Sequence, residues 1–370
     1  MSYCCTECFN DKIIKNDILK SGHSGKCSYC NAIRDHVIDI LALKERFLEL
    51  INFYKVINNN DSIFGAAFLS KWEINLFQGI QKDWDMFIAQ SRCELILSDL
   101  FKDEKDSILQ LSANSIGRIF PNRSSLYSEY GKICFQKISQ SIIFKNRFLL
   151  RGRDFEDFES LIKTGIATFK NYEIVDASKI FYRARIHDGG AKYKFKDLKA
   201  PPFGKANSGR ANPKGIPYLY LASDVDTAIN EVRPPVKTEV CYVKFNAVKK
   251  LRILDLGKEM VIESPFVDGF KDKLRYRDLL NYVAQELNKP VLEENSEFEY
   301  LPTQYLCEYL KSLRSDDRRK PFVHGVKYKS NKATGDNYVL FGVDSAKPNG
   351  DIKKVRIINS SIEYCEVTEN

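Results

Sequence analysis

The chain has no long apolar run. Stretches such as Ser141–Phe144 are far shorter than the ~20 residues that a membrane-spanning helix needs, which argues against a transmembrane protein. The N-terminus, MSYCCTECFNDK, lacks a basic stretch followed by an apolar core, so no secretory signal is expected. Walker and G-x-G-x-x-G loops are also missing, and with them the usual sign of a Rossmann-bound redox cofactor.

The composition excludes two further classes of protein. Of the 370 residues, 44% are apolar and 29% are charged, which fits a globular chain and neither a largely disordered nor a collagen-like one. At ~150 residues per domain, this length predicts two or three domains. The net charge is +8, and the first 150 residues hold 19 basic and 17 acidic side chains, so most of the excess lies in the second half. Such an excess suits a phosphate-bearing ligand or nucleic acid, and equally a solvated mixed-charge surface.

Ten cysteines are present, and half of them lie within the first thirty residues. In a long chain without an export signal, this distribution favours a metal site in a reducing compartment over a disulfide framework. We therefore expect a cytoplasmic protein.

Two C-x-x-C pairs, separated by eighteen residues, have the spacing of a zinc site. The ligands that this spacing predicts are Cys5, Cys8, Cys27 and Cys30. Cys4 is an alternative to Cys5, and His23 in the intervening loop is a weaker candidate. Four thiolates leave no open position for water, so the expected role of the zinc is structural.

Apolar residues recur at helical spacing from Arg34 to about Ile57. Similar patterns follow near Phe68–Phe77, Trp84–Phe101, Leu126–Leu150 and Asp154–Asp176. Few strand signals precede residue 178, so this part is predicted to be a helical bundle with its aromatic residues in the core. Its sequence indicates no function of its own.

After about residue 178 the pattern changes to short segments rich in β-branched and aromatic residues, which predict strands. These segments are KIFYRARI, GIPYLYLAS, EVCYVKF, LRILDL, HGVKYKS, NYVLFGV and IKKVRIINSSIEYCEV. Three helical patterns are inserted between them: DVDTAINEVR, with Asp224 or Asp226 as its cap, LRYRDLLNYVAQEL and PTQYLCEYLKSL. The predicted fold class is α+β, with an N-terminal zinc knuckle and helical bundle before a mixed sheet.

Three polar residues occupy positions that are unusual for a simple core. Arg183 lies in the middle of a predicted strand, Glu231 lies on a helix three residues after Ala228, and Ser330 ends a strand. Strand ends and strand–loop junctions often carry ligand-binding groups. Each residue alone is as well explained by an edge ion pair or a solvated side chain.

Together these residues resemble the RES domain family, which is named after an Arg, a Glu and a Ser. The resemblance runs from about Lys179 to Val343 in four blocks, in the family's order and spacing. The blocks are IFYRAR, GRANPKGIPYLYLASDVDTAINEVRP, YLPTQYLCEYLK and HGVKYKSNKATGDNYVLF. The N-terminal part resembles the extension called the HEPN/RES N-terminal domain. This division predicts a zinc-knuckle module at 1–33, a helical domain at 34–176 and a RES domain at 177–370.

The resemblance implies a fold like that of ADP-ribosyltransferase toxins and an enzyme that breaks the nicotinamide–ribose bond of NAD. NAD would be a substrate, consumed by phosphorolysis or hydrolysis, with inorganic phosphate as a candidate co-substrate. By position, Arg183, Glu231 and Ser330 would be the catalytic residues. The residues implied for NAD binding are Arg210, Tyr220 and Asn337, with Arg185 replacing Arg183 if the strand register differs. The family's aromatic residue after Gly-Arg is here Ala211.

Many members of the family are toxins of toxin–antitoxin pairs, so a toxin or defence effector with an antitoxin or regulatory partner is implied. Two rival functions remain at this point. One is mono-ADP-ribosyl transfer to a protein or nucleic acid through the same pocket. The other is a non-catalytic scaffold whose zinc module binds nucleic acid or a partner. The presence of all three namesake residues argues against this scaffold. A homo-oligomer is a further candidate assembly, and no membrane partner is expected.

Overall fold

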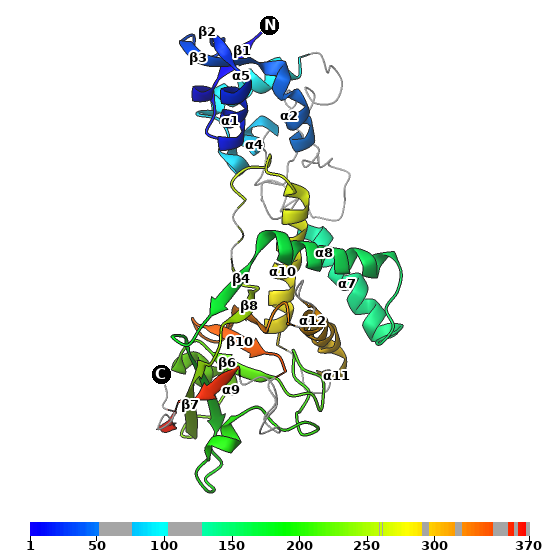
Figure 1. Ribbon diagram of the computed structural model, residues 1–370, viewed down its shortest axis with the longest axis vertical. Helices are drawn as coiled ribbons and strands as arrows, with labels where there is room; N and C mark the ends of the chain where they lie inside the picture. Colours follow the sequence, from blue (N-terminus) through cyan, green and yellow to red (C-terminus); the bar gives the residue numbers. More distant parts are fainter. Residues whose placement is uncertain are drawn as a thin grey trace, which may run out of the picture. The chain divides into compact units, whose positions relative to one another are not determined.

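The computed structural model describes residues 1–51, 76–102, 128–258, 260, 262–290, 296–314, 320–342, 354–358 and 362–367. The chain divides into two compact units. Unit 1 comprises Met1–Tyr130 and Val261–Asp278, and unit 2 comprises Gly131–Met260 and Leu279–Asn370. Figure 1 shows both units and labels many of their elements. No helix within the described ranges is long and apolar enough to cross a membrane.

Unit 1 begins with a small antiparallel sheet in the order β1-β3-β2. Its strands are β1 (Tyr3–Cys5), β2 (His23–Lys26) and β3 (Ile33–Asp39). Helix α1 (Lys12–Ser21) follows the 3-10 helix η1 (Thr6–Cys8), and Asp11 caps α1 by accepting hydrogen bonds from the amides of Ile13 and Ile14. Residues 33–39 thus correct the expected helix from Arg34, because pairing with two neighbouring strands overrides their helical spacing.

Four further described helices, which lie wholly in unit 1, pack around an aromatic core. They are η2 (Ile40–Leu43), α2 (Lys44–Ile51), α4 (Leu76–Trp84) and α5 (Gln90–Leu100). The Phe47 ring stacks on Phe87 at a centroid distance of 5.9 Å and meets Phe266 edge-on at 5.3 Å. Of the helix expected near Phe68–Phe77, residues 68–75 lie outside the described residues.

Two helices of 17 residues each precede the sheet, namely α7 (Ser128–Phe144) and α8 (Arg153–Phe169). Helix α7 lies within the segment Leu126–Leu150 for which the sequence predicts a helix, and α8 begins one residue before the segment predicted from Asp154. The helix predicted to reach Asp176 ends earlier, however, because strand β4 (Tyr172–Val175) pairs with β8. Lys170 closes α8 in the left-handed conformation, with φ of 46°.

The sheet of unit 2 is mixed, and nine strands within the described residues form it, in the order β11-β7-β5-β6-β10-β9-β8-β4 with β12 also pairing with β7. Its strands besides β4 are β5 (Ile180–Ile186), β6 (Leu219–Ala222), β7 (Glu239–Ala247), β8 (Leu251–Asp255), β9 (Gly325–Lys329), β10 (Asp336–Leu340), β11 (Val355–Ile357) and β12 (Glu363–Glu366). The pair β8–β9 is parallel and the other pairs are antiparallel. Each predicted strand segment of the second half therefore contains at least one strand, which confirms the α+β class.

Five described helices are inserted between the strands, and the sequence predicts three of them, α9, α10 and α12, but not the short η3 and α11. They are η3 (Phe195–Leu198), α9 (Val225–Val232), α10 (Phe270–Asn288), α11 (Ser296–Glu299) and α12 (Leu301–Ser312). Of the two caps that the sequence allows, Asp224 is the cap of α9, and its carboxylate accepts a 2.7 Å hydrogen bond from the Thr227 amide. The buried Ala228 of α9 packs against Ala184 of β5 and Val240 of β7. This contact holds α9 on the part of the sheet that carries Arg183.

Candidate active site

The register of three central strands brings polar side chains together. Asn337 of β10 is paired with Tyr328 of β9. Tyr220 of β6 is paired with Val339, which lies two residues after Asn337 on the same strand. Because side chains alternate along a strand, Tyr220, Tyr328 and Asn337 share one face of the sheet. All three residues line a cavity of about 260 Å³ together with Arg183 and Glu231.

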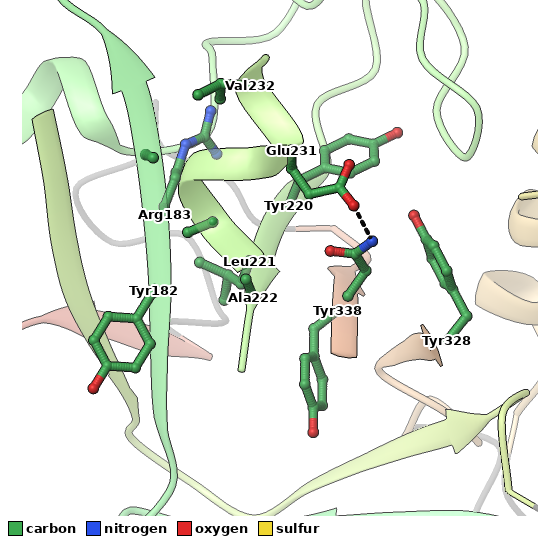
Figure 2. A pocket seen from close by; sticks show the side chains of 12 residues that line it. Tyr182, Arg183, Tyr220, Leu221, Ala222, Glu231, Val232, Tyr328 and Tyr338 are labelled. Atoms are coloured by element: carbon green, nitrogen blue, oxygen red, sulfur yellow. Dashed lines mark hydrogen bonds between the residues drawn. The ribbon is translucent and has the colours of Figure 1, made fainter. Parts of the chain in front are cut away.

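Helix α9 supplies Glu231. Residues three apart lie on the same side of a helix, so the burial of Ala228 turns Glu231 toward the sheet, as the sequence predicts. In Figure 2 the carboxylate of Glu231 extends from α9 toward Tyr220 and Tyr328, and the dashed line marks a hydrogen bond that it accepts. Half-buried Glu231 therefore lies at the wall of the cavity and not on a solvated face.

The carboxylate of Glu231 is hydrogen-bonded by groups from two further segments. Its Oε1 accepts 2.7 Å hydrogen bonds from the Ser330 hydroxyl and from the Asn337 side-chain amide. The structure thus brings Glu231, Ser330 and Asn337, all selected from sequence, into direct contact. Ser330 ends up beside Glu231 because it follows β9 directly, and its amide donates back to the Gly335 carbonyl.

Lys332 is a site residue to which the sequence analysis gives no role. Its ammonium lies 2.8 Å from Oε2 of Glu231 and also donates to the Glu231 main-chain carbonyl at 3.2 Å. Its backbone amide donates to the Ser330 hydroxyl at 3.1 Å. The one signal in the sequence is its position two residues after Ser330, in a polar loop that returns to the next strand.

These contacts determine the charge of Glu231. Burial by itself raises the pKa of a carboxyl group, but hydrogen bonds from Lys332, Asn337 and Ser330 outweigh it and hold the pKa of Glu231 below its ordinary value. The carboxylate is therefore ionised at neutral pH, inside a partly desolvated cavity.

Arg183 lines the same cavity from strand β5. Strand β5 pairs with β6 through Tyr182 and Ala222 alone among the described residues, and Arg183 follows that pair. Figure 2 shows Arg183 extending toward the last turn of α9 while its neighbour Tyr182 points the opposite way. Burial, and secondarily the charge of Arg185, lowers the pKa of Arg183 to about 10, so the guanidinium still carries its charge at neutral pH.

One nitrogen of that guanidinium is available to a ligand. The Nη1 atom of Arg183 is buried and has no hydrogen-bond partner within the part of the chain that the structure describes. Buried polar groups in proteins almost always have a partner. An unpaired cationic donor at the wall of a cavity indicates an anionic group of a bound ligand.

Arg185, the alternative to Arg183, does not line this cavity. It is exposed, and its Nη1 donates to the main-chain carbonyl of Asp197. Its guanidinium lies 5.0 Å from the centre of the Tyr193 ring. The strand register therefore favours Arg183 as the arginine of the site.

A second cavity, of about 200 Å³, borders the other side of Glu231 and includes Arg210, Arg233 and Lys332. Arg210 lies over the Tyr300 ring at 5.5 Å and donates to the Glu286 carbonyl at 3.4 Å. The two cavities share Tyr220, Tyr328, Glu231 and Asn337. Each alone is below the ~300 Å³ at which ligand pockets usually begin, and together they exceed it.

Tyr220 lies at the junction of the two cavities, but its hydroxyl serves the neighbouring loop. It donates to the side chain of Asn212 at 2.7 Å and accepts from the Ala211 amide at 3.2 Å. This pair of bonds fixes the Gly-Arg-Ala-Asn segment and thereby Arg210. Tyr328 lines both cavities, although sequence reasoning did not select it.

Comparison with known families identifies the second half of the chain. The model of the RES domain family matches residues 180–360. The chain therefore contains a RES domain. The match confirms the resemblance drawn from the four sequence blocks and extends it beyond Val343. No curated protein matches the chain.

Among solved structures, this chain is similar to a chain in the crystal structure of the M. tuberculosis MbcT–MbcA toxin–antitoxin complex. The identity is 12% and the TM-score is 0.30, and the alignment covers 57% of this chain and 93% of that chain.

The four cysteines predicted as metal ligands also come together, within unit 1. The sulfur atoms of Cys5, Cys8, Cys27 and Cys30 all lie within 4.8 Å of one another. The Sγ–Sγ distances are 3.8 Å for Cys5–Cys8 and 3.6 Å for both Cys5–Cys30 and Cys8–Cys27. Four sulfurs at ~2.3 Å from a tetrahedral zinc ion would lie ~3.8 Å apart, so the cluster fits zinc.

The structure also separates Cys5 from its two alternatives. Cys4 is buried but is not part of the cluster, because successive strand residues point to opposite faces. His23 is exposed, and its ring lies against Tyr3 at 5.4 Å. The two halves of the cluster come from η1 with the end of β1 and from the turn between β2 and β3.

Proposed function

We propose that the RES domain cleaves the nicotinamide–ribose bond of NAD. The observation that carries this proposal is the arrangement around Glu231. An ionised carboxylate and an arginine whose buried Nη1 has no hydrogen-bond partner among the described residues line one cavity, and Ser330 and Asn337 hold the carboxylate. This arrangement suits a reaction in which positive charge forms on a sugar while phosphate groups are held nearby.

The carboxylate would act on the reacting ribose. When the bond between the ribose C1 and the pyridinium nitrogen breaks, its electron pair stays with the nitrogen, and nicotinamide leaves as a neutral base without an acid catalyst. Positive charge then develops on the ribose ring. A carboxylate fixed in a desolvated site stabilises that charge without having to reorganise, so Glu231 is the residue that most lowers the barrier.

The cations would position the rest of the substrate. A guanidinium offers a planar set of donors that matches phosphate oxygens, which suits Arg183 to the pyrophosphate of NAD or to an attacking phosphate. Arg210 provides a second cation in the adjoining cavity. Catalysis would then consist mainly of orientation and electrostatic stabilisation.

The acceptor completes the reaction. An oxygen of inorganic phosphate would bond to the ribose C1 and give ADP-ribose 1″-phosphate, whereas water would give ADP-ribose and release a proton. Transfer to a protein or nucleic acid would use the same carbocation and another nucleophile. We place phosphorolysis or hydrolysis first, because the four sequence blocks resemble a family that consumes NAD in this way.

We further propose that NAD loss makes the protein a toxin or defence effector, in line with the family's toxin–antitoxin members. An active copy would then need a partner that restrains it until it is required. The cysteine cluster of unit 1 would hold a structural zinc ion through Cys5, Cys8, Cys27 and Cys30. That ion would tie the β1–η1 segment to the β2–β3 turn and take no part in the cleavage.

The test is to follow NAD consumption by the purified full-length protein, with and without inorganic phosphate, and to resolve the products by mass. ADP-ribose 1″-phosphate formed only with phosphate would establish phosphorolysis, and ADP-ribose would establish hydrolysis. A labelled protein or nucleic acid would replace the proposal with transfer. Intact NAD under all conditions, with a chain that is folded by circular dichroism, would contradict the proposed activity.

A further inference from the structure

Lys332 contacts Glu231 at two points. Its ammonium bonds to the carboxylate at 2.8 Å and to the main-chain carbonyl of the same residue at 3.2 Å. The loop that carries Lys332 is also tied to Ser330 through the 3.1 Å hydrogen bond from its backbone amide. The lysine therefore fixes both the side chain and the backbone of the residue on which the proposed reaction depends.

The other partners of the carboxylate are neutral. Ser330 and Asn337 donate to Oε1, whereas Oε2 accepts from the lysine. Within the described residues, Lys332 is the cation that is hydrogen-bonded to Glu231. The lysine side chain is 24% exposed and the Glu231 side chain 30%, so solvent screens this ion pair only partly.

Other charged or titratable groups face the same cavities without a hydrogen bond to Glu231 among the described contacts. They are Arg183 on β5, Tyr220 on β6, Tyr328 on β9, Arg210 in the loop before β6 and Arg233 at the end of α9. The two tyrosines are neutral at physiological pH, because burial raises the pKa of each hydroxyl. The three arginines favour an ionised Glu231 at longer range, which leaves Lys332 as its direct counterion.

We propose that Lys332 is a positioning residue for Glu231, which it keeps ionised and oriented toward the cavity by its bonds to both the carboxylate and the main chain. The inference deepens the proposed NAD cleavage and rests on it for its kinetic consequence. Without the lysine, desolvation would favour the protonated carboxyl, which cannot stabilise the forming ribose cation. The carboxylate would also lose the contact that fixes Oε2.

The first experiment measures the pH dependence of NAD cleavage for Lys332→Met, Lys332→Arg and Lys329→Met. Activity requires the ionised carboxylate and falls as pH drops through the pKa of Glu231. Since a neighbouring cation lowers a carboxyl pKa by about 1–3 units, Lys332→Met should move the acidic limb upward by about one pH unit or more. Lys332→Arg should restore most of the wild-type profile, because it keeps the charge.

Lys329→Met is the matched control. Lys329 lies three residues before Lys332, its side chain is 66% exposed, and it pairs with Asp336 at 2.8 Å. Its removal should leave the acidic limb in place. An unchanged limb in Lys332→Met, or an equal shift in Lys329→Met, would overturn the proposal.

A second measurement needs no NAD. The carboxyl carbons of glutamate are labelled with ¹³C and titrated by NMR, and the Glu231 signal is identified by its loss in Glu231→Gln. Its titration midpoint should rise in Lys332→Met and should be unchanged in Lys329→Met. An unchanged midpoint in Lys332→Met would refute the role of Lys332. This readout is independent of turnover. If the wild-type protein left NAD intact, the proposed function would be contradicted, but the titration would still decide whether Lys332 lowers the pKa of Glu231.

Discussion

The hydroxyl of Ser330 donates a 2.7 Å hydrogen bond to the carboxylate of Glu231, although 99 positions separate the two residues. The bond directs the serine proton to an acceptor that is itself charged, and the serine oxygen accepts from the Lys332 amide. In this arrangement Ser330 orients the carboxylate, which in the proposed reaction acts on the substrate.

Glu231→Gln should abolish NAD cleavage, with a loss of at least about a hundredfold, because an amide lacks the negative charge that stabilises the ribose cation. The fold should persist, since the amide has nearly the same shape. Initial rates and melting temperatures measure the two effects. Asp226→Asn, on the exposed side of the same helix, serves as the control and should keep wild-type activity. Full activity in Glu231→Gln would show that the site has been misassigned.

Ser330→Ala should have a smaller effect. It removes one charge-assisted hydrogen bond, while Asn337 and Lys332 continue to hold Glu231. A hydrogen bond to a charged group contributes ~1.5–3 kcal/mol, which corresponds to a rate loss of about tenfold to a hundredfold at most. Rates at saturating NAD provide the measurement. A loss as complete as that of Glu231→Gln would instead indicate that Ser330 forms a bond to the substrate.

Arg183→Lys and Arg185→Lys form a matched pair on one strand. Arg183 lines the cavity with a buried, unpaired Nη1 among the described residues, whereas Arg185 is exposed and bonded to the Asp197 carbonyl. A lysine keeps the charge but loses the planar set of donors. We therefore expect Arg183→Lys to raise the KM for NAD or lower kcat by about tenfold or more, and Arg185→Lys to change neither by more than about twofold. The reverse ranking would support the alternative register.

Sequence patterns predicted the elements that carry the site, because these elements obey local rules. Strand β5 is rich in β-branched and aromatic residues, and Asp224 caps α9 so that Glu231 follows Ala228 toward the sheet. Strands β3 and β4 were missed because long-range pairing decides them: β3 lies between β1 and β2, and β4 pairs with β8. Their apolar spacing alone is compatible with a helix.

Within the site, too, local patterns predicted some residues, whereas long-range contacts determine others. Arg183, Glu231 and Ser330 were selected by motif, but no local pattern reveals that Lys332 bonds to a glutamate 101 positions earlier. That contact arises because the loop after β9 returns to β10 beside the end of α9. Likewise, spacing predicted the four-cysteine cluster, whereas the choice between Cys4 and Cys5 required the strand to show which of them faces the other cysteines.

Cys5→Ser should remove bound zinc, and Cys4→Ser should retain it. The sulfur of Cys5 lies 3.8 Å from that of Cys8 and 3.6 Å from that of Cys30, whereas Cys4 lies outside the cluster. A structural zinc ion contributes directly to folding, so loss of a ligand should also lower the melting temperature of unit 1. Metal content by mass spectrometry gives the readout. The double change Cys27→Ser with Cys30→Ser should behave like Cys5→Ser, and unchanged zinc in it would refute the ligand set.

Asp278→Asn should stabilise the protein at alkaline pH. Asp278 is 5% exposed, the Nε of Arg277 lies 3.9 Å from its carboxylate, and burial raises its pKa from 3.8 to about 7. Between these two values the folded state binds a proton that the unfolded state has released, so stability present at low pH is lost as pH rises through about 7. A neutral amide removes this loss.

The melting temperature of the Asp278→Asn variant relative to wild type should therefore increase from pH 5 to pH 8, by about 2–4 °C for each kcal/mol. Asp272→Asn, on the same helix with a side chain that is 58% exposed, should show an equal difference at both pH values. An equal difference in Asp278→Asn as well would mean that this carboxyl is ionised in the folded protein throughout the range.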